Sequence, residues 1–186
     1  NSKVYSTSDL SDTVASIKEQ RASQRTGVYK HLMNGVSFMI PFVVAGGIAI
    51  ALSFIFGYKA FEQEGSLASY LMGMGGGAGA FGLMIPILAG YIAYSIADRP
   101  GLAPGMIGGA VAVQLNAGFL GALVAGFLAG YIVYAIKKFI KLPKTLQGIM
   151  PVLIIPVLGS LSTGLILFYV IGKPVALINQ GMINFL

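Results

Sequence analysis

The sequence has no cysteine and little charge, and both absences restrict what the protein can be. Without cysteine, the chain holds no disulfide, no thiolate metal site and no cysteine nucleophile. Charged residues make up 10% of the sequence and hydrophobic residues 56%, whereas soluble domains carry about 25% charge. A soluble protein of this size would need charges throughout to cover its surface, so the composition predicts an integral membrane protein.

Long stretches of the chain contain no charged side chain. A helix of about 20 residues crosses the ~30 Å hydrocarbon layer, and a charge at its centre costs ~2.5–3.5 kcal/mol on insertion scales. The pattern predicts an all-α, polytopic helical membrane protein with about five crossings and a short re-entrant or interfacial segment. The uncharged runs are 31–58, 65–97, 100–136 and 145–172.

Glycine, proline and polar residues divide these runs into elements. Six glycines between Gly73 and Gly82 should interrupt the second run, because glycine disfavours a continuous helix by about 1 kcal/mol each. Residues 98–101 form a predicted polar turn, and residues 116–118 divide the third run into two short crossings. The predicted elements are a crossing at 36–56, a short helix up to 74, crossings near 81–97, within 100–136 and at 147–171, and a further apolar or interfacial helix from 174 to 186.

The basic residues predict the orientation, because cytoplasmic loops carry an excess of Lys and Arg. With five crossings and a cytoplasmic N-terminus, ten of the twelve basic residues fall on the cytoplasmic side. That set is Lys3, Lys18, Arg21, Arg25, Lys30, Arg99, Lys137, Lys138, Lys141 and Lys144, against Lys59 and Lys173 on the other side. They lie at the edges of apolar runs rather than in a basic stripe, which argues against nucleic-acid binding.

Small residues recur at every fourth position in two rows. Such rows lie on one helix face and allow the close approach of a second helix in lipid. They indicate either helix packing within one subunit or a dimer interface. The rows are Gly101, Gly105 and Gly109, and Gly118, Ala122, Gly126 and Gly130.

A few polar side chains stand near the ends of the predicted crossings. Asp98 and Arg99 are adjacent, so their opposite charges can neutralise each other. They form either a structural turn or a site for coupling to, or docking of, a partner. Asn116, like Asn34, has a side-chain amide that can bond a hydroxylated ligand or another helix. His31, the only histidine, is predicted to be a surface residue at the membrane edge. No carboxylate pair, Ser-His-Asp set or metal cluster occurs, so the sequence predicts no catalytic residue, no metal and no cofactor in this chain.

Three segments resemble the fructose family of the membrane component, enzyme IIC, of the bacterial phosphotransferase system. They are 27–47 (GVYKHLMNGVSFMIPFVVAGG), 86–109 (PILAGYIAYSIADRPGLAPGMIGG) and 118–130 (GFLGALVAGFLAG), together with the lysine cluster that follows. The similarity extends over about 27–172, and the block 91–109 is its most specific part.

The resemblance implies a multi-pass permease of the bacterial inner membrane that moves fructose or a similar sugar inward. A phosphocysteine on a cytoplasmic IIB domain then phosphorylates the sugar, with phosphate supplied through HPr and a IIA domain. Residues 1–30 resemble a IIB-to-IIC linker, and residues 31–186 resemble the N-terminal part of IIC, a scaffold that forms homodimers. The missing cysteine fits this expectation, because the phosphoryl carrier lies in the partner.

One departure from the family is clear. The glycine-proline-asparagine and threonine-glutamate-glycine motifs of the later half of IIC do not occur here. The resemblance therefore assigns no sugar-binding residue to this chain, and it leaves open whether the chain shares in the phosphotransferase reaction. The alternative function is a stand-alone membrane anchor or interaction protein derived from a split permease.

Overall fold

A computed structural model describes residues 27–139, 153–172 and 174, and all regular elements in these ranges are helical. The chain divides into two units, Asn1–Lys30 and His31–Leu186, and the bundle described below belongs to the second, apart from the first three residues of its first helix. Its helices are α2 (Val28–Ile55), the short 3₁₀ turn η1 (Ala60–Glu62), α3 (Leu67–Gly75), α4 (Ala80–Ala97), α5 (Arg99–Gln114), α6 (Gly118–Phe139) and α7 (Ile155–Leu167), which continues as the π-helical turn η4 (Phe168–Gly172).

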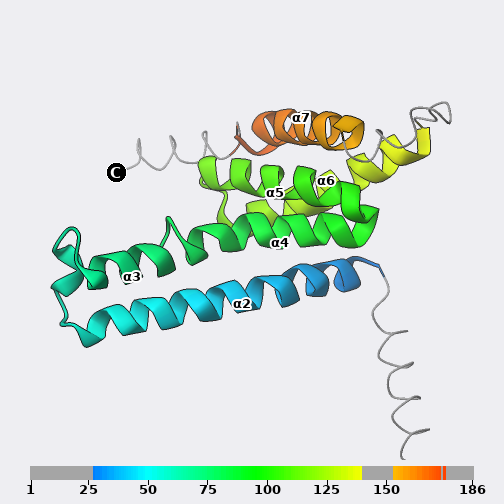
Figure 1. Ribbon diagram of the computed structural model, residues 1–186. Coiled ribbons are helices and arrows are strands. Elements are labelled where there is room, and N and C mark those ends of the chain that lie inside the picture. The colour runs from blue at the N-terminus through cyan, green and yellow to red at the C-terminus, as the bar shows by residue number, and fades with distance from the viewer. Residues whose placement is uncertain (1–26, 140–152, 173, 175–186) are drawn as a thin grey trace, which may run out of the picture. The chain divides into compact units, whose positions relative to one another are not determined.

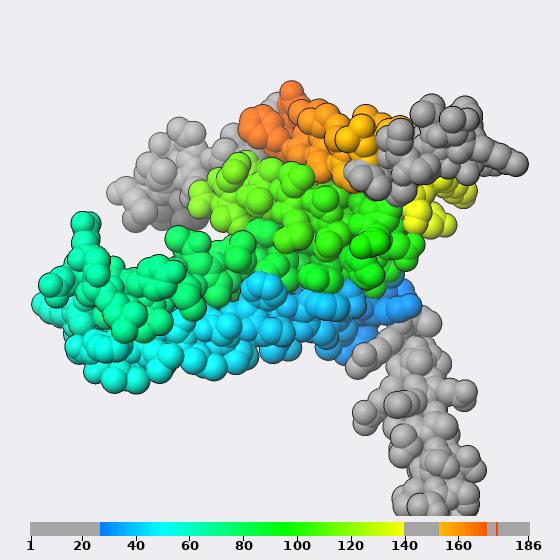
Figure 2. Space-filling view, viewed as in Figure 1, coloured from blue at the N-terminus to red at the C-terminus, as the bar shows by residue number. Residues whose placement is uncertain are grey.

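The centre of the bundle is formed by α4, α5 and α6, which all pack on one another, and α7 packs on α5 and α6. On the other side, α2 runs along α3 and α4 (Figures 1 and 2). The core is rich in alanine, so the helix backbones lie close together. Its buried members are Leu88, Ala89, Ile92, Ala112, Ala122, Ala125 and Leu167.

Length and composition make several of these helices membrane-spanning candidates. Val28–Ile55, Leu67–Ala97 and Gly118–Phe139 are each long and apolar enough to cross a bilayer, and Ile155–Val170 is a shorter apolar helix. Their outward-facing side chains are largely exposed and apolar, as expected of helices surrounded by lipid. The protein is thus an all-α, polytopic membrane protein, as its sequence predicts.

The predicted interruption of the second uncharged run is present. The helix stops at Gly75, and α4 begins at Ala80. A side chain at Gly79 would collide with the carbonyl oxygen of Met74, and one at Gly82 with that of Gly77. Glycine therefore permits a break this tight, and the short helix ahead of it is α3.

The polar turn predicted at 98–101 is wrong in its extent. The helix breaks only at Asp98, whose φ of 61° lies in the left-handed region, and α5 already begins at Arg99. Pro100 lies in the first turn of α5, where its missing N–H costs nothing because that donor would have no helical partner. The turn between α5 and α6 falls at residues 115–117, one residue before the predicted position.

The first helix begins earlier than predicted, at Val28 rather than residue 36. Its first turns are polar, and two of their side chains bond α4, so tertiary contacts rather than an apolar run extend it. Three predicted segments lie at least partly outside the described residues. They are the linker at 1–30, of which 1–26 are not described, the crossing at 147–171, whose start is not described, and nearly all of the helix at 174–186.

Candidate functional site

Three features could carry function: the charged end of α4, the polar contact between α2 and α4, and a groove between α2 and α3. At the charged end, Lys137 Nζ of α6 donates to Asp98 Oδ2 at 3.0 Å and to the Ala97 carbonyl at 3.1 Å. The Lys137 and Asp98 side chains are 36% and 83% exposed. An ion pair so exposed contributes at most about 1 kcal/mol, so it orients the end of α6 more than it stabilises the bundle.

The sequence suggested that Asp98 neutralises the adjacent Arg99, but Asp98 has a different partner. Its ion pair is with Lys137, from a helix that begins twenty residues later along the chain. Arg99, in the first turn of α5, is exposed. The guanidinium of Arg99 is therefore presented to solvent at the same end of the bundle as the ion pair.

Asn116 lies far from this charged end. It occupies the turn after α5, with a left-handed φ of 53°, and its backbone N–H donates to the Val113 carbonyl at 3.0 Å. The sixteen residues of α5 separate Asn116 from Asp98, a distance of about 24 Å at 1.5 Å per residue. The structure does not bring Asn116 together with Asp98 and Arg99, and Asn116 has the conformation of a turn residue.

Five of the seven members of the two rows of small residues face α4 of the same chain. A Cβ added at Gly126 of α6 would lie 2.8 Å from the Ala89 carbonyl oxygen, and one at Gly105 of α5 would lie 2.7 Å from the same atom. Gly109 and Gly130 are equally close to Pro86 and Ile96 of α4. The remaining members of the rows are Ala122, which is fully buried, Gly101, which abuts the Ala93 carbonyl, and Gly118, which begins α6 with a φ of 56° and has no atom near its Cβ position. The five glycines against α4 thus pack within one chain, and a dimer interface at the rows stays a prediction.

A polar contact joins α2 to α4: its Asn34 part is one of the alternatives that the sequence offered, whereas its His31 part was not foreseen. Asn34 Nδ2 donates to the Tyr91 carbonyl at 2.8 Å, and the ring of Tyr91 stacks on Phe38 with centroids 3.8 Å apart. His31 Nδ1 lies 2.8 Å from Ser95 Oγ. The expected surface histidine is thus half-buried between two helices. The sequence does carry a signal for this contact: His31, Asn34 and Phe38 are three and four positions apart on α2 and therefore share a helix face.

Buried hydroxyls on α7 form a weaker feature. Thr163 is fully buried against Gly108 of α5, and within the described residues neither Thr163 Oγ1 nor Ser160 Oγ has a hydrogen-bond partner. An unpaired buried hydroxyl costs about 1–3 kcal/mol. Over the described ranges, no group of three or more His, Cys, Asp or Glu side chains is placed to hold a metal ion.

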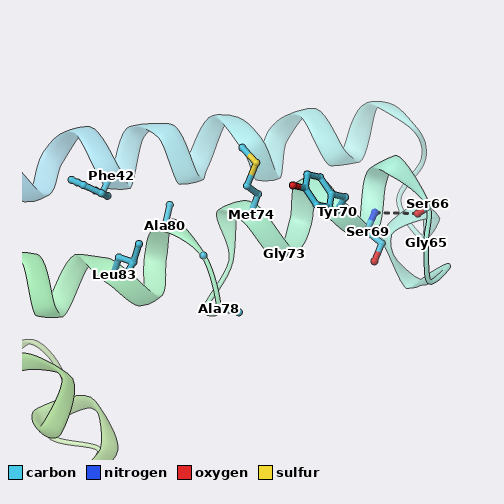
Figure 3. Close-up of a pocket in the computed structure, with 11 residues that line it drawn as sticks. Phe42, Gly65, Ser66, Ser69, Tyr70, Gly73, Met74, Ala78, Ala80 and Leu83 are labelled. Carbon is cyan, nitrogen blue, oxygen red and sulfur yellow. Dashed lines mark hydrogen bonds between the residues drawn. The ribbon is translucent and has the colours of Figure 1, made fainter.

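The groove lies between α2 and the pair formed by α3 and the start of α4 (Figure 3). Its volume is about 860 Å³. None of the described residues that line it is charged. The lining residues are Phe42, Gly65, Ser66, Ser69, Tyr70, Gly73, Met74, Ala78, Gly79, Ala80 and Leu83.

Comparison with known proteins identifies the family. The family model described as "Phosphotransferase system, EIIC" matches residues 33–186. The chain is 62% identical over 178 residues to the "PTS system fructose-specific EIIB'BC component" of Rhodobacter capsulatus, which covers 96% of this chain and 31% of that protein. It is 57% identical to the protein of the same description in Vibrio cholerae, over 95% of this chain and 30% of the relative.

A shorter relative also matches. "Fructose-like permease IIC component 2" of Escherichia coli is 42% identical over 84% of this chain and 44% of its own length. The chain thus spans about a quarter to a half of the length of the relatives it matches. No solved structure matches it. The family match covers the whole described helix bundle apart from the first turns of α2, and the chain belongs to the EIIC family of the phosphotransferase system.

Proposed function

We propose that the chain is the N-terminal membrane part of a fructose-type sugar permease. The permease moves the sugar across the cytoplasmic membrane for phosphorylation by a IIB domain, and this part is mainly its scaffold. The observation that carries the proposal is the 62% identity to a fructose-specific EIIB'BC component across nearly the whole chain. In such relatives the segment lies within a longer permease, which favours this function over a stand-alone membrane anchor.

The architecture fits a scaffold better than a catalytic unit. Helices α4, α5 and α6 pack closely on one another around the Ala89 carbonyl, as expected of a scaffold. The phosphoryl group would come from a phosphocysteine of the IIB partner, supplied in turn by IIA and HPr. Once phosphorylated, the sugar carries a charge that the bilayer opposes, so phosphorylation retains it inside.

A chimera tests this function directly. Residues 33–186 replace the matching segment of the Rhodobacter capsulatus relative, and the chimera is expressed in a strain without its own fructose uptake. We expect phosphoenolpyruvate-dependent uptake of labelled fructose near that of the parent. The same permease without the segment is the negative control. A chimera that reaches the membrane at the parent's abundance but takes up no fructose would refute the proposal.

The proposed topology places the N-terminus and the charged end of α4 in the cytoplasm, with residues 1–30 as a linker from IIB and the permease as a homodimer. Arg99 is then exposed on the side from which the phosphorylated IIB domain approaches. We expect Arg99→Ala in the chimera to lower phosphorylation-coupled uptake, since a guanidinium binds phosphate strongly. Lys138→Ala, an exposed cation on α6, is the matched control. Normal uptake by Arg99→Ala at normal abundance would rule out a coupling role.

A further inference from the structure

The groove between α2 and α3 changes in polarity from one end to the other (Figure 3). At the end nearest the loop that precedes α3, it is lined by the hydroxyl side chains of Ser66, Ser69 and Tyr70. At the other end, it is lined by Phe42 and Leu83, which carry no polar side-chain atom. An occupant of matching chemistry has one polar end and a long apolar remainder.

The groove also has the depth of one leaflet. Its wall follows α3, whose nine residues span about 14 Å at 1.5 Å per residue, and then α4 as far as Leu83, which adds about 6 Å. Half of a bilayer of ~40–45 Å, headgroup regions included, is about 20–22 Å. The loop ahead of α3 carries Lys59, Glu62 and Glu64, and charges of this density belong at the membrane surface. The polar end of the groove therefore lies at the surface and the apolar end near the mid-plane.

The side chains along the groove face outward rather than into the bundle. Tyr70 is 71% exposed, Met74 54% and Leu83 48%. The two helices touch closely at Gly46 and Gly75, where a Cβ on Gly75 would collide with the Gly46 carbonyl oxygen. Beside this contact the helices leave the groove open, and its mouth lies between two membrane-spanning candidates.

We propose that this groove binds a phospholipid, with an acyl chain along α3 and the glycerol end beside Ser69 and Tyr70. The polarity gradient, its direction and its depth match a lipid standing in one leaflet. A sugar fits poorly, because it needs several convergent polar groups. The Ser66 hydroxyl already accepts from the Ser69 N–H and donates to the Ala60 carbonyl, and half of the groove offers no polar side chain. The acyl chain fills the space between α2 and α3 that side chains leave open.

Glycine supplies a clean way to fill the groove. Gly73 lines it, and an added Cβ there meets no atom within 4 Å, so Gly73→Leu occupies the space without displacing backbone. Gly47 of α2 has the same open surroundings but does not line the groove. Gly47→Leu therefore adds the same side chain to the lipid-facing surface and serves as the matched control.

The measurement is native mass spectrometry of the chimeric permease, extracted in mild detergent and supplied with phosphatidylethanolamine. We expect a resolved one-lipid adduct for the parent and for Gly47→Leu, and loss of that adduct for Gly73→Leu. Equal adducts on all three proteins would overturn the proposal. Fructose that displaces the adduct from the parent would also overturn it, in favour of a sugar site.

A second pair of variants guards against misfolding of the first. Leu83→Gln makes the apolar end of the groove polar, whereas Leu120→Gln makes the same change on α6 at a residue that is also exposed. Only Leu83→Gln should weaken the adduct. Fructose uptake is recorded in parallel, so that failure of the lipid site and failure of the permease function are seen separately.

Discussion

Gly126 is the position at which the packing of the bundle is most directly tested. A Cβ placed there would lie 2.8 Å from the Ala89 carbonyl oxygen, 2.9 Å from Ile92 Cβ and 3.0 Å from Ala89 Cα. Two of these atoms belong to the backbone of α4, which cannot turn aside as a flexible side chain does. Gly126→Ala must therefore move α4 and α6 apart.

The cost follows from overpacking. Inserting a methyl group into a closely packed core typically costs 1–3 kcal/mol, and 1 kcal/mol shifts the melting temperature by roughly 2–4 °C for 150–250 residues. We expect Gly126→Ala to melt about 2–12 °C below the parent. Gly164 of α7 has no atom within 4 Å of an added Cβ, so Gly164→Ala should be neutral or stabilising by up to ~1 kcal/mol.

The assay is thermal unfolding of the purified permease in one detergent, followed by loss of the monodisperse peak in size-exclusion chromatography. Gly126→Leu adds a second readout. If the row packs within the chain, Gly126→Leu should lower the yield of folded protein in both the monomer and the dimer peak. If the row is a subunit contact, the variant should instead elute as folded monomer. A melting temperature for Gly126→Ala equal to or above that of Gly164→Ala would refute the reasoning.

Three further variants test the contacts between helices by the same thermal assay. Lys137→Met should lower the free energy of unfolding by at most about 1 kcal/mol, yet more than Lys138→Met, because only Lys137 bonds Asp98 and the α4 carbonyl end. Asn34→Leu should cost about 0.6–1.7 kcal/mol, the range of hydrogen bonds between membrane helices, with the exposed Gln114→Leu as control; equal effects would contradict the contact. Thr163→Val should raise the melting temperature, since it removes a buried hydroxyl without a partner among the described residues, and a lower value would show that the hydroxyl is bonded.

Features with a local signal were predictable from the sequence. The break at 76–79 follows from a run of glycines, and the turn at Asn116 follows from an Asn two residues before a Gly. As a result, α3, α4, α5 and α6 begin or end within a few residues of their predicted bounds. Both signals act through the chain's own φ and ψ, independent of any neighbour.

Features that depend on distant residues were not predictable. Nothing near Asp98 in sequence indicates Lys137 as its partner in place of Arg99. The contact of Asn34 with the Tyr91 carbonyl likewise needs the helices to be placed first, because any backbone carbonyl is an equivalent acceptor by sequence. A row of small residues reports only that a helix surface is flat, so it predicted a close neighbour for α6 and left open which neighbour.

The closeness of α4, α5 and α6 at Ala89 has a mechanical consequence. Both Gly105 and Gly126 abut the Ala89 carbonyl, so a rotation or axial slide of one helix would drive a neighbouring side chain into its backbone. Packed interfaces of this kind rearrange in discrete steps or not at all. We expect the three helices to behave as one rigid body during the proposed transport cycle, so that any displacement is taken up where they meet α2 or at the glycine break.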